Sequence, residues 1–137
     1  MLRITALFLG LTSTLLLTGC GDGGKARMQG TVTFDGQPIE EGSISFLPAD
    51  GTDSRKASAA ILKGVYDIPA DRAPTAGKFK VEITWMKRTG NKIASADPGM
   101  APADETKEAI PAKYNRESTL VRDLVAGENK LDFNLEP

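Results

Sequence analysis

Apolar and polar residues alternate along much of the chain from residue 28 onward. The clearest segment is 78–86, in which Phe79, Val81, Ile83 and Trp85 alternate with Lys78, Lys80, Glu82 and Thr84. A period of two is typical of an antiparallel strand with one buried face. We therefore expect a half-buried strand here, and the phase of Trp85 favours packing in the core.

Six further segments have strand-like patterns and are separated by turn signals. They are 28–34, 43–48, 57–62, 65–69, 118–125 and 130–135. Asp35-Gly36 is a strong hairpin signal, and we expect further turns at Lys63-Gly64 and at Ala126–Asn129. Short strands at this spacing, without a convincing long helix, predict an all-β fold, a seven-stranded antiparallel Greek-key β-sandwich.

One predicted strand, 118–125, has a charged residue in its apolar phase. Arg122 alternates together with Leu120 and Leu124. Either this strand lies at a sheet edge, where the arginine extends its charged end to water, or a bulge shifts the phase.

A long polar excursion, residues 87–117, precedes the last two predicted strands. Connections of this length are usually functional or disordered. We expect a mobile middle at 94–103, a helical turn over 104–109 capped by Asp104, and anchoring of the far end through Ile110, Pro111 and Tyr114. We predict that this excursion is a contact loop, with these candidate residues: Asp97, Asp104, Glu105, Glu108 and Tyr114.

The first residues have the pattern of an export signal. Arg3 precedes an apolar run over 4–17, which is shorter than the roughly 20 residues needed to span a bilayer. The junction that follows, Leu17-Thr18-Gly19-Cys20, resembles the bacterial lipobox. The resemblance implies export by the general secretory route, cleavage before Cys20, and lipid on its sulfur. Two or three acyl chains anchor a protein stably to a membrane.

These signals divide the chain into three parts. Residues 1–19 are expected to be a lipoprotein signal peptide, residues 20–25 the lipidated cysteine with a flexible tether, and residues 26–137 one domain. Gly21, rather than an aspartate, follows Cys20, which favours the outer membrane in bacteria that have two membranes.

Composition excludes several kinds of chemistry. The chain has one cysteine and no histidine, so the folded part lacks disulfides, thiol ligands and histidine-based triads. A formal net charge of −1 without a basic stripe gives no reason to bind nucleic acid. The acidic residues match no calcium-loop pattern. We therefore expect no enzyme activity, no cofactor, and no catalytic, cofactor-binding or metal-binding residue.

The run Gly30-x-Val32-x-x-Asp35-Gly36-x-Pro38, followed by Gly42, resembles the carboxypeptidase regulatory-like domain family. Segments 64–68 and 77–81 resemble two later motifs of that family, although Phe79 and Ala76 stand where Tyr and Pro are common. The resemblance covers 26–136 and implies a transthyretin-like (prealbumin-like) seven-stranded sandwich, as in small bacterial lipoproteins.

The family resemblance implies a fold and a location but no reaction, because the domain is a non-catalytic accessory in carboxypeptidases. Hydroxyisourate hydrolases, an enzyme class with the transthyretin fold, use histidines and a C-terminal Tyr-Arg-Gly-Ser, whereas this chain ends in NLEP. The resemblance to those enzymes therefore ends at the fold.

Three functions are compatible with these observations. The first is a lipid-anchored, non-catalytic envelope protein that presents the sandwich as an interaction or structural module to an envelope protein or glycan. The second is a solute-binding module for glycan or calcium at the sandwich loops. The third is pairing of an edge strand with a partner.

Overall fold

The computed structural model describes residues 23–49 and 51–137. The predicted signal peptide and the lipobox residues Leu17, Thr18, Gly19 and Cys20 lie outside these residues.

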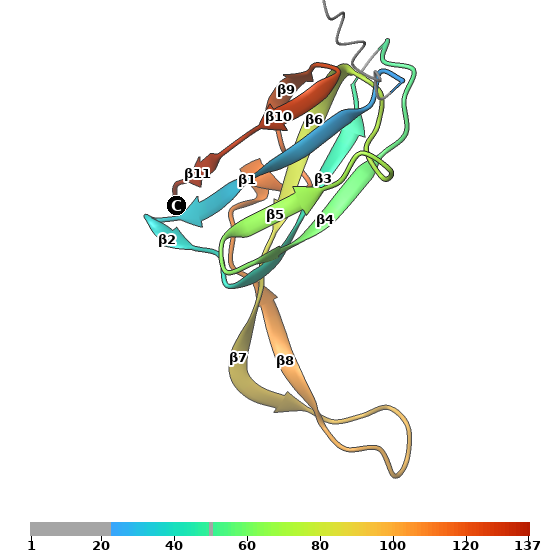
Figure 1. The fold of residues 1–137 in the computed structure, drawn as a ribbon. Helices are drawn as coiled ribbons and strands as arrows, with labels where there is room; N and C mark the ends of the chain where they lie inside the picture. The colour runs from blue at the N-terminus through green and yellow to red at the C-terminus, as the bar shows by residue number, and fades with distance from the viewer. Residues whose placement is uncertain (1–22, 50) are drawn as a thin grey trace, which may run out of the picture.

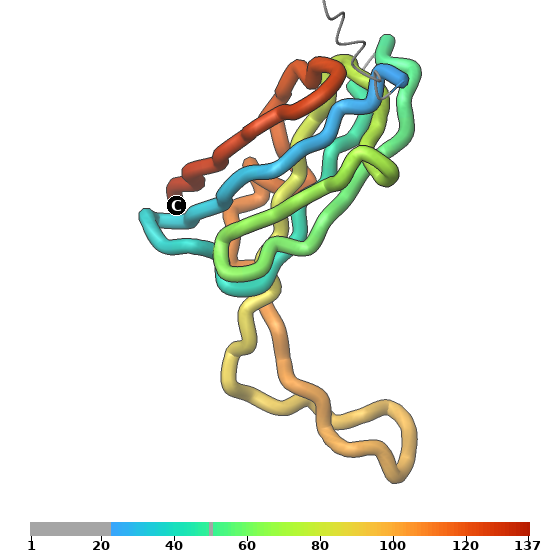
Figure 2. The backbone as a smooth tube through the Cα atoms, viewed as in Figure 1, coloured from blue at the N-terminus to red at the C-terminus, as the bar shows by residue number. Residues whose placement is uncertain are grey.

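The described chain is all-β (Figures 1 and 2). Its elements are β1 (Ala26–Phe34), β2 (Gln37–Pro38), β3 (Glu41–Pro48), β4 (Ala57–Leu62), β5 (Val65–Ile68), β6 (Gly77–Thr84), β7 (Met86–Ile93), β8 (Ala103–Glu108), the 3-10 turn η1 (Ala112–Tyr114), β9 (Val121–Leu124), β10 (Gly127–Lys130) and β11 (Phe133–Leu135). Within the described ranges, no helix is long and apolar enough to cross a membrane.

Most strands form one curled, mainly antiparallel sheet, with the order β10-β1-β5-β4-β3-β6-β9. The strands β10 and β11 run parallel to β1. Only Leu62 and Val65 pair between β4 and β5, so the sheet folds over at that hairpin. The group β10-β1-β5 therefore curls over the group β4-β3-β6-β9, an arrangement consistent with a sandwich (Figure 1).

The core lies between the two groups of strands and follows the predicted alternation. Phe79, Val81 and Ile83 of β6 have no exposed surface, as expected for one face of a strand. Residues from the other strands complete the core: Met28, Val32, Ile44, Phe46, Ile61, Tyr66, Ile68, Phe133 and Leu135. Trp85 follows the end of β6 and is only partly buried, so it packs at the margin of the core rather than inside it.

Two predicted hairpin turns are confirmed. Asp35 and Gly36 have φ values of 50° and 74°, and Lys63 and Gly64 have φ values of 51° and 77°. Two consecutive residues with positive φ are typical of the type I′ turn, whose twist matches that of the flanking strands. These turns join β1 to β2 and β4 to β5.

The prediction of a hairpin turn at Ala126–Asn129 is wrong. Three of these residues lie in β10, which pairs with β1, whereas β9 pairs with β6. The connection from β9 to β10 therefore crosses from one group of strands to the other. Short turn-like sequences are compatible with both outcomes, because the partner of each strand is decided by distant residues.

The prediction of a long polar loop is also wrong in its main part. Residues 86–108 form a β-hairpin, and the helical turn expected over 104–109 is instead β8. Every residue of β7 is exposed. A strand without a buried face has no period-two pattern, so the alternation used above could not reveal it.

Arg122 lies on an edge strand, which was the first of the two arrangements expected for it. Its strand, β9, is the last on the path of the sheet, and its pairing with β6 is continuous from Lys80 to Gly77, without a bulge. The guanidinium carbon lies 5.2 Å from the centroid of the Phe133 ring, and Nη1 donates to the carbonyl of Val121. The arginine therefore covers the open margin of the core while its charged end reaches the surface.

Candidate interface at the arm and its base

The hairpin of residues 86–108, which we call the arm, projects from one end of the sheet body (Figure 1). Met86 pairs with Glu108 at its base, and Ile93 pairs with Ala103 further out. Among the described residues, β7 and β8 pair only with each other. The arm therefore adds no strand to the sheet of the body and leaves both of its own edges free.

The arm and the start of β1 lie at opposite ends of the body (Figure 2). Lys25, which precedes β1, forms a bridge with Thr75 and accepts a hydrogen bond from the Gly127 N–H at 2.8 Å. These contacts fix the beginning of the body beside the junction of β9 and β10. The arm leaves from the other end, where β6 finishes.

Charge is divided between the two arm strands. β7 carries Lys87, Arg88 and Lys92, and most charges of β8 are acidic. Asp104 forms ion pairs with Lys92 and, at 3.6 Å, with Arg88. Both cations are largely exposed, so these pairs align the strands but contribute little stability.

Glu105 forms hydrogen bonds to the part of β7 where the strand register shifts, between Arg88 and Lys92. Its carboxylate accepts hydrogen bonds from the Thr89 hydroxyl and, at 2.9 Å, from the Asn91 amide. Hydrogen bonds to the ionised form favour it, first from Thr89 and then from Asn91, and lower the pKa of Glu105 below its ordinary value.

Glu108 connects the arm to the body. Its Oε1 accepts the backbone N–H of Trp85 at 2.9 Å and that of Ile110 at 3.0 Å. The N–H of Ala109 in turn donates to the Trp85 carbonyl at 2.9 Å. These hydrogen bonds join the two strands of the arm where they leave the sheet.

The structure separates the five predicted contact residues. Asp104, Glu105 and Glu108 lie on β8, whereas Asp97 lies in the exposed tip loop, where its N–H donates to Ser95 Oγ. Tyr114 lies in η1 on the body, and its hydroxyl accepts the Glu136 N–H at 3.1 Å. In the described part of the chain, no three Asp, Glu, Cys or His residues are grouped so as to hold a metal ion.

A cleft of about 580 Å³ lies at the junction of the arm with the body. It is lined by Gln37, Pro38, Glu40, Lys63, Trp85 and Lys87. The Trp85 ring makes an edge contact with Phe34, at 6.4 Å between centroids, and the Lys87 Nζ lies 4.7 Å from the centroid of the indole. Lys63 and Lys87 were not among the residues predicted from the sequence, because three separate segments form the cleft. The spacing of Trp85 and Lys87, two residues apart, was the available signal.

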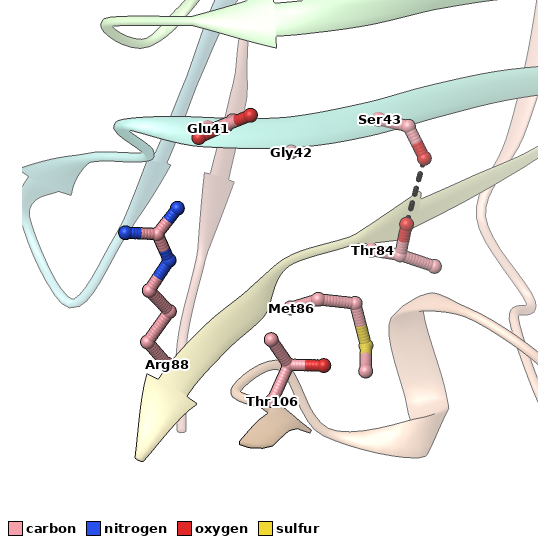
Figure 3. A pocket seen from close by; sticks show the side chains of 7 residues that line it. All are labelled: Glu41, Gly42, Ser43, Thr84, Met86, Arg88 and Thr106. Atoms are coloured by element: carbon pink, nitrogen blue, oxygen red, sulfur yellow. Dashed lines mark hydrogen bonds between the residues drawn. The ribbon is translucent and has the colours of Figure 1, made fainter. Parts of the chain in front are cut away.

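A second cleft, of about 370 Å³, is lined by polar residues of β3 and β6 and by residues of the arm (Figure 3). Its hydroxyl groups, on Ser43 and Thr84, lie 2.7 Å apart and bond to each other. Each hydroxyl has the other as its hydrogen-bond partner, and the cleft presents a polar surface.

Comparison with known proteins gave no relative from which a function follows. No protein-family model matches the chain, and comparisons with the curated proteins and with the solved structures found no match. A function is therefore inferred from the geometry of the arm and of its base.

Proposed function

We propose that the chain is a non-catalytic, lipid-anchored protein of the cell envelope. In this proposal one β-sandwich is an interaction module, and the arm is its contact element. The observation that carries the proposal is that β7 and β8 pair only with each other among the described strands, at the end of the body opposite the start of β1.

The finer fold assignment within this proposal is a transthyretin-like, Greek-key sandwich. The seven-strand path β10-β1-β5-β4-β3-β6-β9 and the single Cα pair that joins β4 to β5 support two facing layers. The resemblance of the motif at residues 30–42 to the carboxypeptidase regulatory-like family supports it independently.

The geometry suits a protein held by its N-terminus. Five peptide units separate Cys20 from Lys25, which limits their separation to roughly 18 Å. A lipid on Cys20 would keep the β1 end of the body near the membrane and direct the arm away from it. The eight residues of β7 span roughly 25 Å, so the arm extends the reach of the module beyond the body.

The free edges of the arm favour strand addition as the mode of contact. An exposed edge offers unpaired N–H and C=O groups to an extended segment of a partner. A two-stranded hairpin is marginally stable alone in water and gains stability from a third strand. Met100, in the tip loop, exposes 65% of its surface and adds an apolar contact.

Intact mass and membrane fractionation test the anchor. The full chain, expressed in a bacterium, should lose residues 1–19, gain the mass of lipid, and remain with the membranes. Cys20→Ala should keep its signal peptide or become soluble, without added lipid. Release of both forms without modification would contradict the anchored proposal.

Site-specific photocrosslinking in the same cells tests the arm. A photoreactive amino acid at Met100 should give discrete crosslinked products. The same amino acid at Val125, which is 61% exposed between β9 and β10, is the matched control and should give none. Identical products from both positions, or none from Met100, would remove the arm from the proposal.

A further inference from the structure

The cleft around Trp85 combines an aromatic surface with positive charge. The proposed contact role of the arm needs neither feature. Trp85 is partly exposed there, although its ring packs against Phe34 and its backbone N–H donates to Glu108. Lys63, from the turn between β4 and β5, and Lys87, from the arm, both line the cleft. Glu40 is the one acidic residue among the lining residues.

The strand register adds a third lysine to this face. Lys87 pairs directly with Lys107, so both side chains lie on the same face of the arm. Trp85 precedes Lys87 by two residues, and the Lys87 Nζ lies 4.7 Å from the centroid of its indole, so the two side chains lie on the same side of the base of the arm. Like charges directly opposite each other destabilise a strand pair, and an anion between the two ammonium groups would remove that cost.

We propose that this cleft binds an anionic saccharide, of the class that carries carboxylates on its sugar rings. The face of a sugar ring would stack on the Trp85 indole, and its carboxylate would lie between Lys87 and Lys107. Gln37 and Glu40 supply polar groups for the sugar hydroxyls. Lys87 would move from its position over the ring, where it lies now, to the carboxylate.

The chemistry of the cleft favours this ligand class over simpler ones. A small inorganic anion would use the lysines but leave the indole uncovered. A neutral sugar would use the indole but leave Lys87 and Lys107 without an opposite charge between them. An acidic sugar satisfies both features. The proposal does not rest on the lipid anchor, because the residues that carry it all lie in the body and the arm.

Tryptophan fluorescence tests the proposal directly, because Trp85 is the only tryptophan of the chain. The full chain, purified in detergent, is titrated with trigalacturonic acid, with neutral maltotriose and with inorganic phosphate. We expect a saturable change in Trp85 emission with trigalacturonic acid alone, and weaker binding at higher salt concentration. No change, or an equal response to maltotriose or to phosphate, would overturn the proposal.

Charge variants identify the binding residues. Lys87→Gln together with Lys107→Gln should weaken binding at least tenfold, and both positions are exposed, so the fold should persist. Lys113→Gln is the matched control, because the Lys113 Nζ also lies over an aromatic ring, 5.1 Å from the centroid of Tyr114, but on the body. Unchanged affinity in the double variant, or an equal loss in the control, would also overturn the proposal.

Discussion

The hydroxyl of Tyr66 donates a hydrogen bond to the backbone carbonyl of Leu131, 2.8 Å away. Tyr66 lies on β5, and Leu131 lies between β10 and β11, so the bond spans β1, which separates them in the sheet. The Tyr66 ring also contacts the rings of Phe46 and Phe133 in the core. This side chain therefore holds the C-terminal strands against the rest of the body.

Removal of the Tyr66 hydroxyl should destabilise the fold. Tyr66→Phe leaves the Leu131 carbonyl without this donor, and we expect a loss of about 1–2 kcal/mol in the free energy of unfolding. Urea denaturation measures this loss, and the slope of the unfolding free energy against urea concentration should stay unchanged. Tyr114→Phe is the control, because its hydroxyl makes a more exposed bond, to Glu136, and it should cost less than half as much. Equal losses would contradict the role assigned to Tyr66.

Alkaline pH should lower the stability of the fold through Tyr66. Burial, and then the charge of Asp132, raise the pKa of Tyr66 above its ordinary value of 10.0. Above that value the unfolded chain releases this proton while the folded chain keeps it, so the contribution of Tyr66 to stability is complete below pH 10 and declines as pH rises toward the folded pKa.

The absorbance of tyrosinate measures this effect in Tyr114→Phe, where Tyr66 is the only tyrosine. At about pH 11, the signal should stay low while the chain is folded and rise when urea unfolds it. A full tyrosinate signal from the folded protein would show that the pKa of Tyr66 is not raised.

A methyl group at Gly30 should disrupt the sheet. A Cβ added there would overlap the carbonyl oxygen of Leu131, with the carbonyl carbon at 2.6 Å, and backbone cannot move aside as a flexible side chain does. We expect Gly30→Ala to cost about 3 kcal/mol by thermal or urea unfolding. Gly99→Ala, which has open space in the tip loop but a φ of 93°, should cost less, about 1–2 kcal/mol from backbone strain alone. A smaller loss for Gly30→Ala than for Gly99→Ala would reject this explanation.

The arm should be dispensable for the stability of the body. Met86 and Glu108 are direct partners at its base, so an Asn-Gly turn between them can replace residues 87–107. We expect unfolding free energies of the shortened and full chains to agree within about 1 kcal/mol, because the replaced residues contribute nothing to the core. A much larger loss, measured by urea unfolding, would mean that the arm is part of the cooperative fold.

Local pattern was sufficient to predict the elements that bury one face. The alternation in β6 and the Asp35-Gly36 turn needed no knowledge of partners, because a half-buried strand and a type I′ turn each depend on a few adjacent residues. The same reasoning assigned a contact role to the excursion that contains Asp104 and Glu105. It could not reveal that these residues form a strand, since no residue of β7 or β8 is fully buried.

The sequence by itself determined that this protein is all-β, where most strands lie, and that residues 21–137 contain no cysteine or histidine. Only the tertiary structure decided that β10 pairs with β1 rather than with β9, and that Lys63, Lys87 and Trp85 line one cleft. The physical reason is the distance along the sequence between the residues that interact. Alternation and turn conformation are set by neighbouring residues, whereas strand partners and shared clefts depend on contacts between segments far apart in the chain.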